Sequence, residues 1–292
     1  MTVADALRLA ERRLAAAGVA APAWDAELLL RHVLRWDRAA LLAGDALALN
    51  PEQEVLFLSL VAERERRRPL QHLTGTQSFW GRDFIVSPDV LIPRRETELL
   101  VEAALELLAG VAAPVVVDVG TGTGCIALTI AAERLSAEVH AVDISPAALE
   151  VARANARRLG LEGRVLFHEG DLTLPAHELS GRVDLVASNP PYVRVDEVPE
   201  LAPEVRDHEP RMALVPTPNA AGLYRRLAAE AHRLLRPEGG LIVEIGLGMR
   251  DEVAAICESE GLRIERVIPD LQGIPRILVA RRPTRSIPPD LA

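Results

Sequence analysis

The first part of the chain carries a helical pattern of apolar side chains. Positions such as Leu7 and Leu14 recur at the spacing of one helix face, and the pattern is interrupted at Pro22 and Pro51, where new helices can begin. Residues 1–73 are therefore predicted to form a small helical domain.

The pattern then changes to short runs that favour strands. Phe79-Trp80 and Phe84-Ile85-Val86 are separated by Gly81, and Ser87-Pro88-Asp89 follows as a turn signal. These features predict a β-hairpin linker within residues 74–95.

Helical patterns alternate with apolar runs over residues 96–284, as in a parallel sheet covered by helices. The strand candidates are Val115–Val119, Glu138–Val142, Arg164–His168, Val183–Ala187, Leu241–Ile245, Arg263–Ile268 and Arg276–Ala280. The last two candidates are close enough in sequence to be antiparallel. The fold class predicted is therefore α/β, with a Rossmann-like seven-stranded sheet, and the proline-containing residues 285–292 are predicted to be a mobile tail.

Composition excludes several functions. The formal net charge of -9 disfavours stable binding of nucleic acid, and the absence of lysine among the 33 basic residues excludes a Walker phosphate loop and a pyridoxal Schiff base. No run approaches the roughly 20 apolar residues of a membrane helix, and no secretory pattern opens the chain, so we expect a cytoplasmic protein.

Cys125 and Cys257 lack neighbours at metal-ligand spacing, and we predict buried thiols and no metal. The basic run Arg64 and Arg66 to Arg68 is expected at a helix end, facing solvent.

A glycine-rich turn follows the first strand candidate of the sheet. Gly120-Thr121-Gly122-Thr123-Gly124 leads into a helix predicted to begin near Cys125. Glycines let the backbone approach a ligand closely, and the helix start offers free N–H groups. The turn is typical of a nucleotide-cofactor site, but its glycine spacing also fits a dinucleotide such as NAD.

Three acids bear on the choice of cofactor. Asp143 at the end of the next strand is suited to a ribose diol, with a helix cap before Pro146 as the alternative. Asp118 is placed for the cationic amino-acid portion of S-adenosylmethionine, and Asp171 for its adenine amino group. Together they favour S-adenosylmethionine, with S-adenosylhomocysteine as product, over NAD.

A second motif follows the strand candidate Val183–Ala187. Asn189-Pro190-Pro191-Tyr192 stands where ligands of open α/β sheets bind, although an ordinary Asn-Pro turn is the alternative. The Asn189 side-chain oxygen and the Pro190 carbonyl can accept both N–H groups of a planar NH2, and Tyr192 can pack on the plane. Holding the nitrogen in this way favours the charge that develops as it is methylated.

With these residues in place, the sequence closely resembles the PrmC/HemK family of bacterial glutamine methyltransferases, which modify peptide chain release factors. The resemblance covers almost the whole chain. It is carried by Pro69 to Gly75, Phe79-Trp80-Gly81, Val90 to Arg94, Glu96-Thr97-Glu98, the glycine turn, Asn189 to Tyr192 and Glu209-Pro210-Arg211.

The resemblance implies a class I methyltransferase domain that methylates N5 of the glutamine in the Gly-Gly-Gln motif of class I release factors. It implies that the helical domain helps to hold the factor, and that Asn189 to Tyr192 meet the glutamine. It also implies that Gly120 to Gly124, Asp143, Leu172 beside Asp171, and Asn189 contact the cofactor.

The chain departs from the family pattern in two places. Arg95 stands where proline is usual, and Pro216 to Asn219 replaces a glycine-containing turn. Residues 193–218 are expected to be a long proline-interrupted loop that acts as a lid and orders on substrate binding.

Other functions remain open at this point. A glutamine methyltransferase of a ribosomal protein shares the acceptor turn, and an adenine-N6 methyltransferase of DNA or RNA uses the same planar NH2 geometry. The acidic charge and few aromatic residues count against the latter. The intact Asn189 turn argues against a non-catalytic cofactor-binding adaptor and against an NAD-dependent protein.

Overall fold

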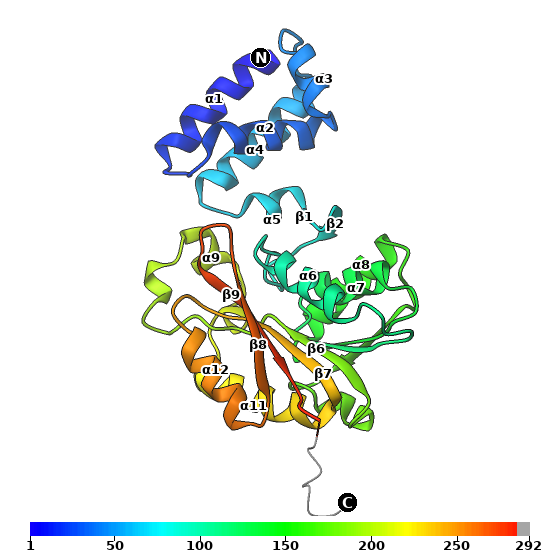
Figure 1. The fold of residues 1–292 in the computed structure, drawn as a ribbon. Helices are drawn as coiled ribbons and strands as arrows, with labels where there is room; N and C mark the ends of the chain where they lie inside the picture. Colours follow the sequence, from blue (N-terminus) through cyan, green and yellow to red (C-terminus); the bar gives the residue numbers. More distant parts are fainter. Residues whose placement is uncertain (285–292) are drawn as a thin grey trace, which may run out of the picture. The chain divides into compact units, whose positions relative to one another are not determined.

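The computed structural model describes residues 1–284 (Figure 1), so the predicted tail at 285–292 lies outside the described residues. The chain divides into two compact units. The first unit comprises residues 1–76 together with residues 201–208, and the second comprises residues 77–200 and the chain from residue 209 onward.

The first unit is helical. Proline occupies the first turn of both α2 and α4, where its missing N–H costs no hydrogen bond, and the side chain of Asn50 caps α4. Leu14, Leu29 and Phe57 are fully buried at its centre. The helices are α1 Val3–Ala16, α2 Pro22–Leu34, α3 Arg38–Ala43, α4 Pro51–Glu65, α5 Leu70–Thr74 and, from far along the chain, α9 Pro203–His208.

Arg64, near the end of α4, is buried. Its Nε donates to Oδ2 of Asp25 at 2.7 Å and its Nη2 to Oε1 of Glu204 at 2.8 Å. Arg67 donates twice to the same Glu204 carboxylate. Burial alone would raise the pKa of Glu204, but the bonds to Arg67 and Arg64 hold it at about 2. The solvent-facing prediction is therefore wrong for Arg64, because its partner Glu204 lies 140 residues away.

The second unit contains the predicted seven-stranded sheet. Its strands lie in the order β5-β4-β3-β6-β7-β9-β8, and all pairs are parallel except those of β9 with β7 and β8, so the α/β prediction is confirmed. The strands are β3 Val115–Val119, β4 Glu138–Asp143, β5 Val165–Glu169, β6 Val183–Ser188, β7 Leu235–Glu244, β8 Arg263–Pro269 and β9 Pro275–Arg281. The strand order reverses between β3 and β6, and the loops after those strands can therefore form a site at one edge.

Helices cover both faces of the sheet (Figure 1). One apolar core lies beneath α6 Thr97–Leu107, α7 Cys125–Glu133 and α8 Pro146–Arg158, and the other beneath α11 Ala220–Leu234 and α12 Arg250–Ser259. Both faces of the central strands are buried, which explains their uninterrupted apolar sequences.

The predicted hairpin is present as β1 Thr76–Phe79 and β2 Arg82–Ile85. Its two turn residues, Trp80 and Gly81, both have positive φ, as tight hairpin turns require. Phe79 and Phe84 pack edge to face, with ring centroids 6.0 Å apart, and join the core beneath α6 and α7. The hairpin thus contributes to the same core that supports one face of the sheet.

The sequence predicted one long irregular loop for residues 193–218, but the structure contains short helices there. It contains η2 Val198–Glu200, α9, and α10 Arg211–Leu214, while η1 Leu174–Leu179 lies earlier, after β5. Pro203 is the first residue of α9 and Pro210 caps α10, so prolines that indicated interruption instead begin helices. Within residues 1–284, no helix is both long and apolar enough to cross a membrane.

Candidate functional site

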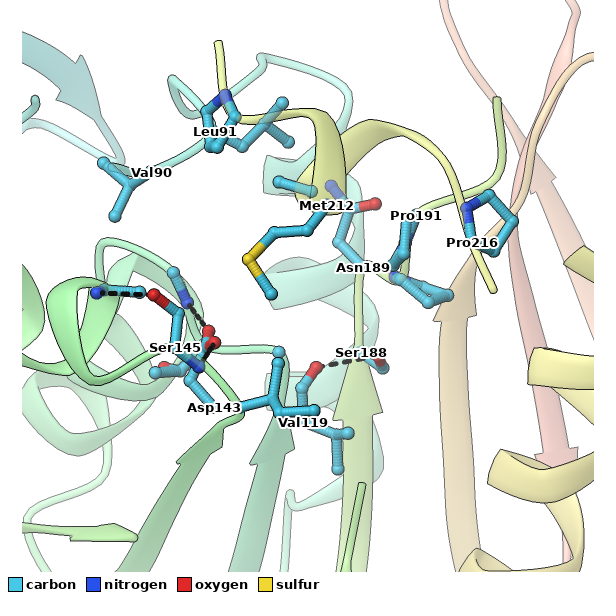
Figure 2. Close-up of a pocket in the computed structure, with 18 of the residues that line it drawn as sticks. Val90, Leu91, Val119, Asp143, Ser145, Ser188, Asn189, Pro191, Met212 and Pro216 are labelled. Carbon is cyan, nitrogen blue, oxygen red and sulfur yellow. Dashed lines mark hydrogen bonds between the residues drawn. The ribbon is translucent and has the colours of Figure 1, made fainter. Parts of the chain in front are cut away.

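A cavity of about 430 Å³ lies at the carboxyl ends of the parallel strands, within the size range of small-molecule sites. The loops after β3, β4, β5 and β6 form its floor and sides, and the segments 89–94 and 210–217 form its outer wall. In Figure 2, Asp143 and Ser145 lie on one side, Asn189 and Pro191 lie on the other, and Met212 lies between them.

The glycine turn is fixed to the end of the neighbouring strand β4. The backbone N–H groups of Gly120 and Thr121 both donate to the Val142 carbonyl, at 2.8 and 3.0 Å. The φ angles of Gly120 and Gly122 are +71° and +53°, in the region that favours glycine. The turn exposes Gly120 to Thr123 to the cavity, and their contact with a cofactor stays a prediction.

Asp143 lies on the cavity wall and organises the turn. Its Oδ2 accepts the Gly122 N–H at 2.8 Å and its Oδ1 accepts the Ser145 N–H at 2.9 Å. A carboxylate has about four acceptor positions, so these bonds leave capacity for a ligand hydroxyl. Burial raises the pKa of Asp143, although hydrogen bonds from the backbone of Ser145, Gly122 and Ile144 oppose the rise. Ser145, not Asp143, caps α8, which removes the alternative role of Asp143 as that cap.

Asp118 and Gly124 do not line the cavity, and their expected interaction with a cofactor stays a prediction. Asp118 is fully buried, and its Oδ2 accepts the Thr121 hydroxyl at 2.6 Å and the Ala127 N–H at 3.2 Å. Its Oδ1 has no hydrogen-bond partner among the described residues, and burial raises its pKa to about 7. Gly124 begins α7 with φ +81°, and a Cβ there would come within 2.9 Å of the Leu128 side chain.

Asp171 and Leu172 line the cavity from the loop after β5. The carboxylate of Asp171 is hydrogen-bonded and ion-paired to Arg226 of α11, which also lines the cavity. Leu172 has φ +52°, and the adjoining Thr173 is held by the buried Glu230, which accepts both its N–H and its hydroxyl. These contacts place the side chains expected for an adenine at the same edge as Asp143.

Asn189, Pro190 and Pro191 line the opposite side of the cavity. The preceding residue, Ser188, donates its hydroxyl to the Val119 carbonyl at 2.8 Å, which ties the end of β6 to the end of β3 (Figure 2). The Asn189 Nδ2 donates to Thr97 Oγ1 at 3.2 Å. The two motifs that the sequence singled out, the glycine turn and the Asn189 turn, therefore lie on two sides of one cavity.

Tyr192 does not line the cavity, so its expected packing against a substrate plane is not supported by its position. Its hydroxyl donates to Glu244 Oε1 at 3.2 Å, and its ring lies so close to Gly246 that a Cβ there would approach it to 3.1 Å. Tyr192 packs against the core under α11 and α12.

No residue of the outer wall was named as a site residue by sequence, although the wall segment 210–217 lies within the predicted lid. Val90, Leu91 and Met212 provide an apolar surface there. Arg94 donates to the buried Glu209 at 2.6 Å, which connects the two wall segments. Val90, Leu91, Arg94 and Glu209 lie in segments that carry the family resemblance, and Met212 lies in the predicted lid.

The arrangement has two chemically different sides. Carboxylates and backbone groups that can hold a cationic nucleoside derivative occupy one, and hydrogen-bond acceptors in a rigid Asn-Pro-Pro turn occupy the other. Among residues 1–284, no group of three His, Cys, Asp or Glu side chains could hold a metal ion. Burial raises the pKa of Cys125, at the cavity wall, to about 12, so its thiol is not an activated nucleophile.

Comparisons with known proteins give a consistent result. A family model described as PrmC N-terminal domain matches residues 5–75, and one described as methyltransferase domain matches residues 112–263. The chain is 46% identical over 284 residues to a release factor glutamine methyltransferase of Cereibacter sphaeroides, covering 97% of this chain and 99% of that protein. Proteins of the same name from Koribacter versatilis and Moorella thermoacetica are each 43% identical, with 97% of this chain covered and 100% and 99% of theirs.

Proposed function

Because the chain belongs to the family of release factor glutamine methyltransferases, we propose that it methylates the glutamine of the Gly-Gly-Gln motif in class I peptide chain release factors. The methyl donor is S-adenosylmethionine and the acceptor is the side-chain amide nitrogen. The modification tunes translation termination, and we expect the enzyme to act in the cytoplasm. One observation carries the proposal: a single cavity joins the glycine turn and Asp143 to the Asn189-Pro190-Pro191 turn.

The residues of one side fit S-adenosylmethionine. Asp143 has free acceptor positions for a ribose diol, and Gly120 to Thr123 leave room for close approach of a ligand. Asp171 and Leu172 stand where an adenine would lie, although the amino group of the adenine must share the Asp171 carboxylate with Arg226. When bound, S-adenosylmethionine supplies a methyl carbon that a nitrogen lone pair can attack while the carbon–sulfur electrons leave on sulfur.

The residues of the other side act on the nitrogen. An amide nitrogen is a weak nucleophile, since its lone pair is delocalised into the carbonyl. The Asn189 oxygen and the Pro190 carbonyl can accept its two N–H groups, which orients the nitrogen and stabilises the positive charge that develops on it. The nitrogen becomes acidic as it is alkylated, so no strong base is needed beforehand. Positioning accounts for most of the rate.

The substrate is tested with the purified full chain and isotope-labelled S-adenosylmethionine. Release factor, ribosomal protein and DNA are supplied separately, and mass spectrometry of the product locates the methyl group. Label on the Gly-Gly-Gln glutamine of the release factor is the expected result. Label only on a ribosomal glutamine or on adenine would replace the proposed substrate by one of those alternatives.

The role of the acceptor turn is tested by Asn189→Ala. This variant is expected to bind S-adenosylmethionine normally and to lose roughly a hundredfold or more in kcat, the cost of removing one preorganised hydrogen-bonding group from a transition state. Single-turnover methyl transfer measures the chemical step, and calorimetry measures cofactor binding. Turnover equal to that of the unmodified chain would refute the role given to Asn189.

A further inference from the structure

Behind the acceptor turn, buried hydroxyl groups converge on one carboxylate. Glu244, the last residue of β7, is 2% exposed. Its Oε2 accepts the Thr97 hydroxyl at 2.6 Å and its Oε1 accepts the Tyr192 hydroxyl at 3.2 Å. The hydroxyl of Tyr224 donates to the Glu244 backbone carbonyl at 2.7 Å. The carboxylate is thus fixed in place, with a donor on each oxygen.

Thr97 connects this carboxylate to the cavity. It is the first residue of α6, is 2% exposed, and accepts the Asn189 Nδ2–H at 3.2 Å. A threonine hydroxyl has one proton, and Thr97 donates that proton to Glu244. Its oxygen is therefore an acceptor toward Asn189, which must present its NH2 group and not its carbonyl oxygen to Thr97.

The direction of this chain of hydrogen bonds determines what the substrate meets. The two ends of the Asn189 amide are chemically opposite, and Oδ1 makes no hydrogen bond to any of residues 1–284. With Nδ2 held by Thr97, Oδ1 is left for the cavity and can accept from a substrate NH2. In the reversed orientation, Asn189 Oδ1 would face Thr97 Oγ1, and both are acceptors. The Asn189 NH2 group would then face the substrate NH2 group, and both are donors.

We propose that Thr97 and Glu244 are positioning residues that fix the Asn189 amide with its oxygen toward the substrate nitrogen. This inference rests on the proposed function, since it concerns how the acceptor side holds an NH2 group. Thr97 and Glu244 act through Asn189, and neither has to exchange a proton with the substrate. The two residues lie 147 positions apart in the sequence and meet only in the fold.

The first test is Thr97→Val, which keeps the shape of the side chain and removes the hydroxyl. Asn189 then loses the acceptor that orients it, and kcat is expected to fall roughly tenfold to a hundredfold, as for other misplaced catalytic groups, with little change in the Kd for S-adenosylmethionine. Thr97→Ser, which restores the hydroxyl, is expected to recover most of the turnover. Unchanged kcat in a folded Thr97→Val protein would overturn the proposal.

Thr129→Val is the matched control. Thr129 is fully buried in α7, does not line the cavity, and its hydroxyl has no hydrogen-bond partner among the described residues. The control therefore makes the same change of side chain without altering the hydrogen bonds that link Glu244, Thr97 and Asn189. Its kcat is expected to equal that of the unmodified protein, and an equal loss in both valine variants would also overturn the proposal, because it would indicate a general packing effect.

A second variant gives a readout that packing would not alter. Once protonated, Glu244 can donate to Thr97, and the orientation of Asn189 is no longer fixed. Because burial raises the pKa of Glu244, kcat at saturating substrates is expected to fall as pH decreases through that pKa. Glu244→Gln should lower kcat and abolish this fall of kcat at acidic pH. A pH profile of kcat that keeps the same acidic fall in the variant would count against the role of Glu244. The groups that interact with its carboxylate are Thr97, Glu96, Cys125, Tyr192, Tyr224 and Arg276.

A structural measurement separates this inference from the proposed substrate. Neutron diffraction of the unmodified chain locates the hydrogens of the Asn189 NH2 group without any turnover. Hydrogens directed at Thr97 Oγ1 are expected, and hydrogens directed into the cavity would overturn the positioning role whatever the substrate is. Absence of methyl transfer to release factor, with the hydrogens at Thr97, would instead reject the proposed function alone.

Discussion

Replacing Asp118 by asparagine is expected to stabilise the second unit above neutral pH. Burial holds the pKa of Asp118 at about 7, against 3.8 for an exposed aspartate. Between those values the folded chain retains a proton that the unfolded chain has lost, so stability falls as pH rises through this window. At about 1.4 kcal/mol per pH unit, the charged carboxylate costs roughly 4 kcal/mol above pH 7.

Asparagine removes that charge and keeps an oxygen for the Thr121 hydroxyl and the Ala127 N–H. Its NH2 group replaces Oδ1, which has no partner among residues 1–284, and an unsatisfied buried donor costs about 1–3 kcal/mol. The net gain at pH 8.5 is therefore expected to be roughly 1–3 kcal/mol, or about 2–4 °C in Tm per kcal/mol. At pH 5, about 1.2 units above the unfolded-state pKa, the cost is only roughly 1.6 kcal/mol. The unsatisfied NH2 group offsets it, so the net gain should be close to zero.

Calorimetric unfolding at pH 5 and pH 8.5 measures the effect. Asp184→Asn is the control, because Asp184 is also buried but pairs with Arg236, and its neutralisation should lower the Tm at pH 8.5. A difference between Asp118→Asn and the unmodified chain that is the same at both pH values would refute the electrostatic reasoning. The variant should also bind the cationic S-adenosylmethionine more weakly at pH 8.5, since a nearby negative charge is lost.

Two further predictions concern carboxylates that organise backbone or helices. Asp143→Ala should weaken S-adenosylmethionine binding roughly tenfold to a hundredfold, because Gly122 and the ribose both lose a charged acceptor; an unaltered Kd by calorimetry would contradict this. Glu204→Gln should destabilise the first unit by roughly 1–3 kcal/mol at pH 7, since Arg64 and Arg67 lose their shared charge; an unchanged denaturation midpoint would count against it.

The sequence predicted those parts of the fold whose signals are local. The strands β3, β4 and β6 are short apolar runs buried on both faces, and each was placed to within a residue. The strand β7 begins six residues before its predicted start at Leu241, because Arg236 to Gly239 reads as a turn. In the fold that stretch is a bulge, with Glu238 at φ +64° and a shifted register against β6, which no alternation pattern reveals.

Only the parts of the site that have a local sequence signal could be predicted. The glycine turn and the Asn189 turn are contiguous motifs, and the sheet topology brings them together. Thr97 and Glu244 carry no such motif, and their importance comes from a hydrogen bond between residues far apart in the chain. Asp118 and Tyr192 belong to motifs, but their side chains point into the protein, a direction that residue type alone does not specify.

The distribution of buried carboxylates is consistent with the charge of the proposed reactants. Burial raises the pKa of Asp118, Asp143 and Glu244, and within residues 1–284 none of the three forms an ion pair. Glu209, on the outer wall, is paired with Arg94. An uncompensated buried charge is costly, so its retention needs a compensating interaction. A cationic methyl donor would supply a compensating interaction for Asp118 and Asp143. The substrate nitrogen, which becomes positive during transfer, would supply one for Glu244. The instability of the free site would then be part of its selectivity for cationic ligands.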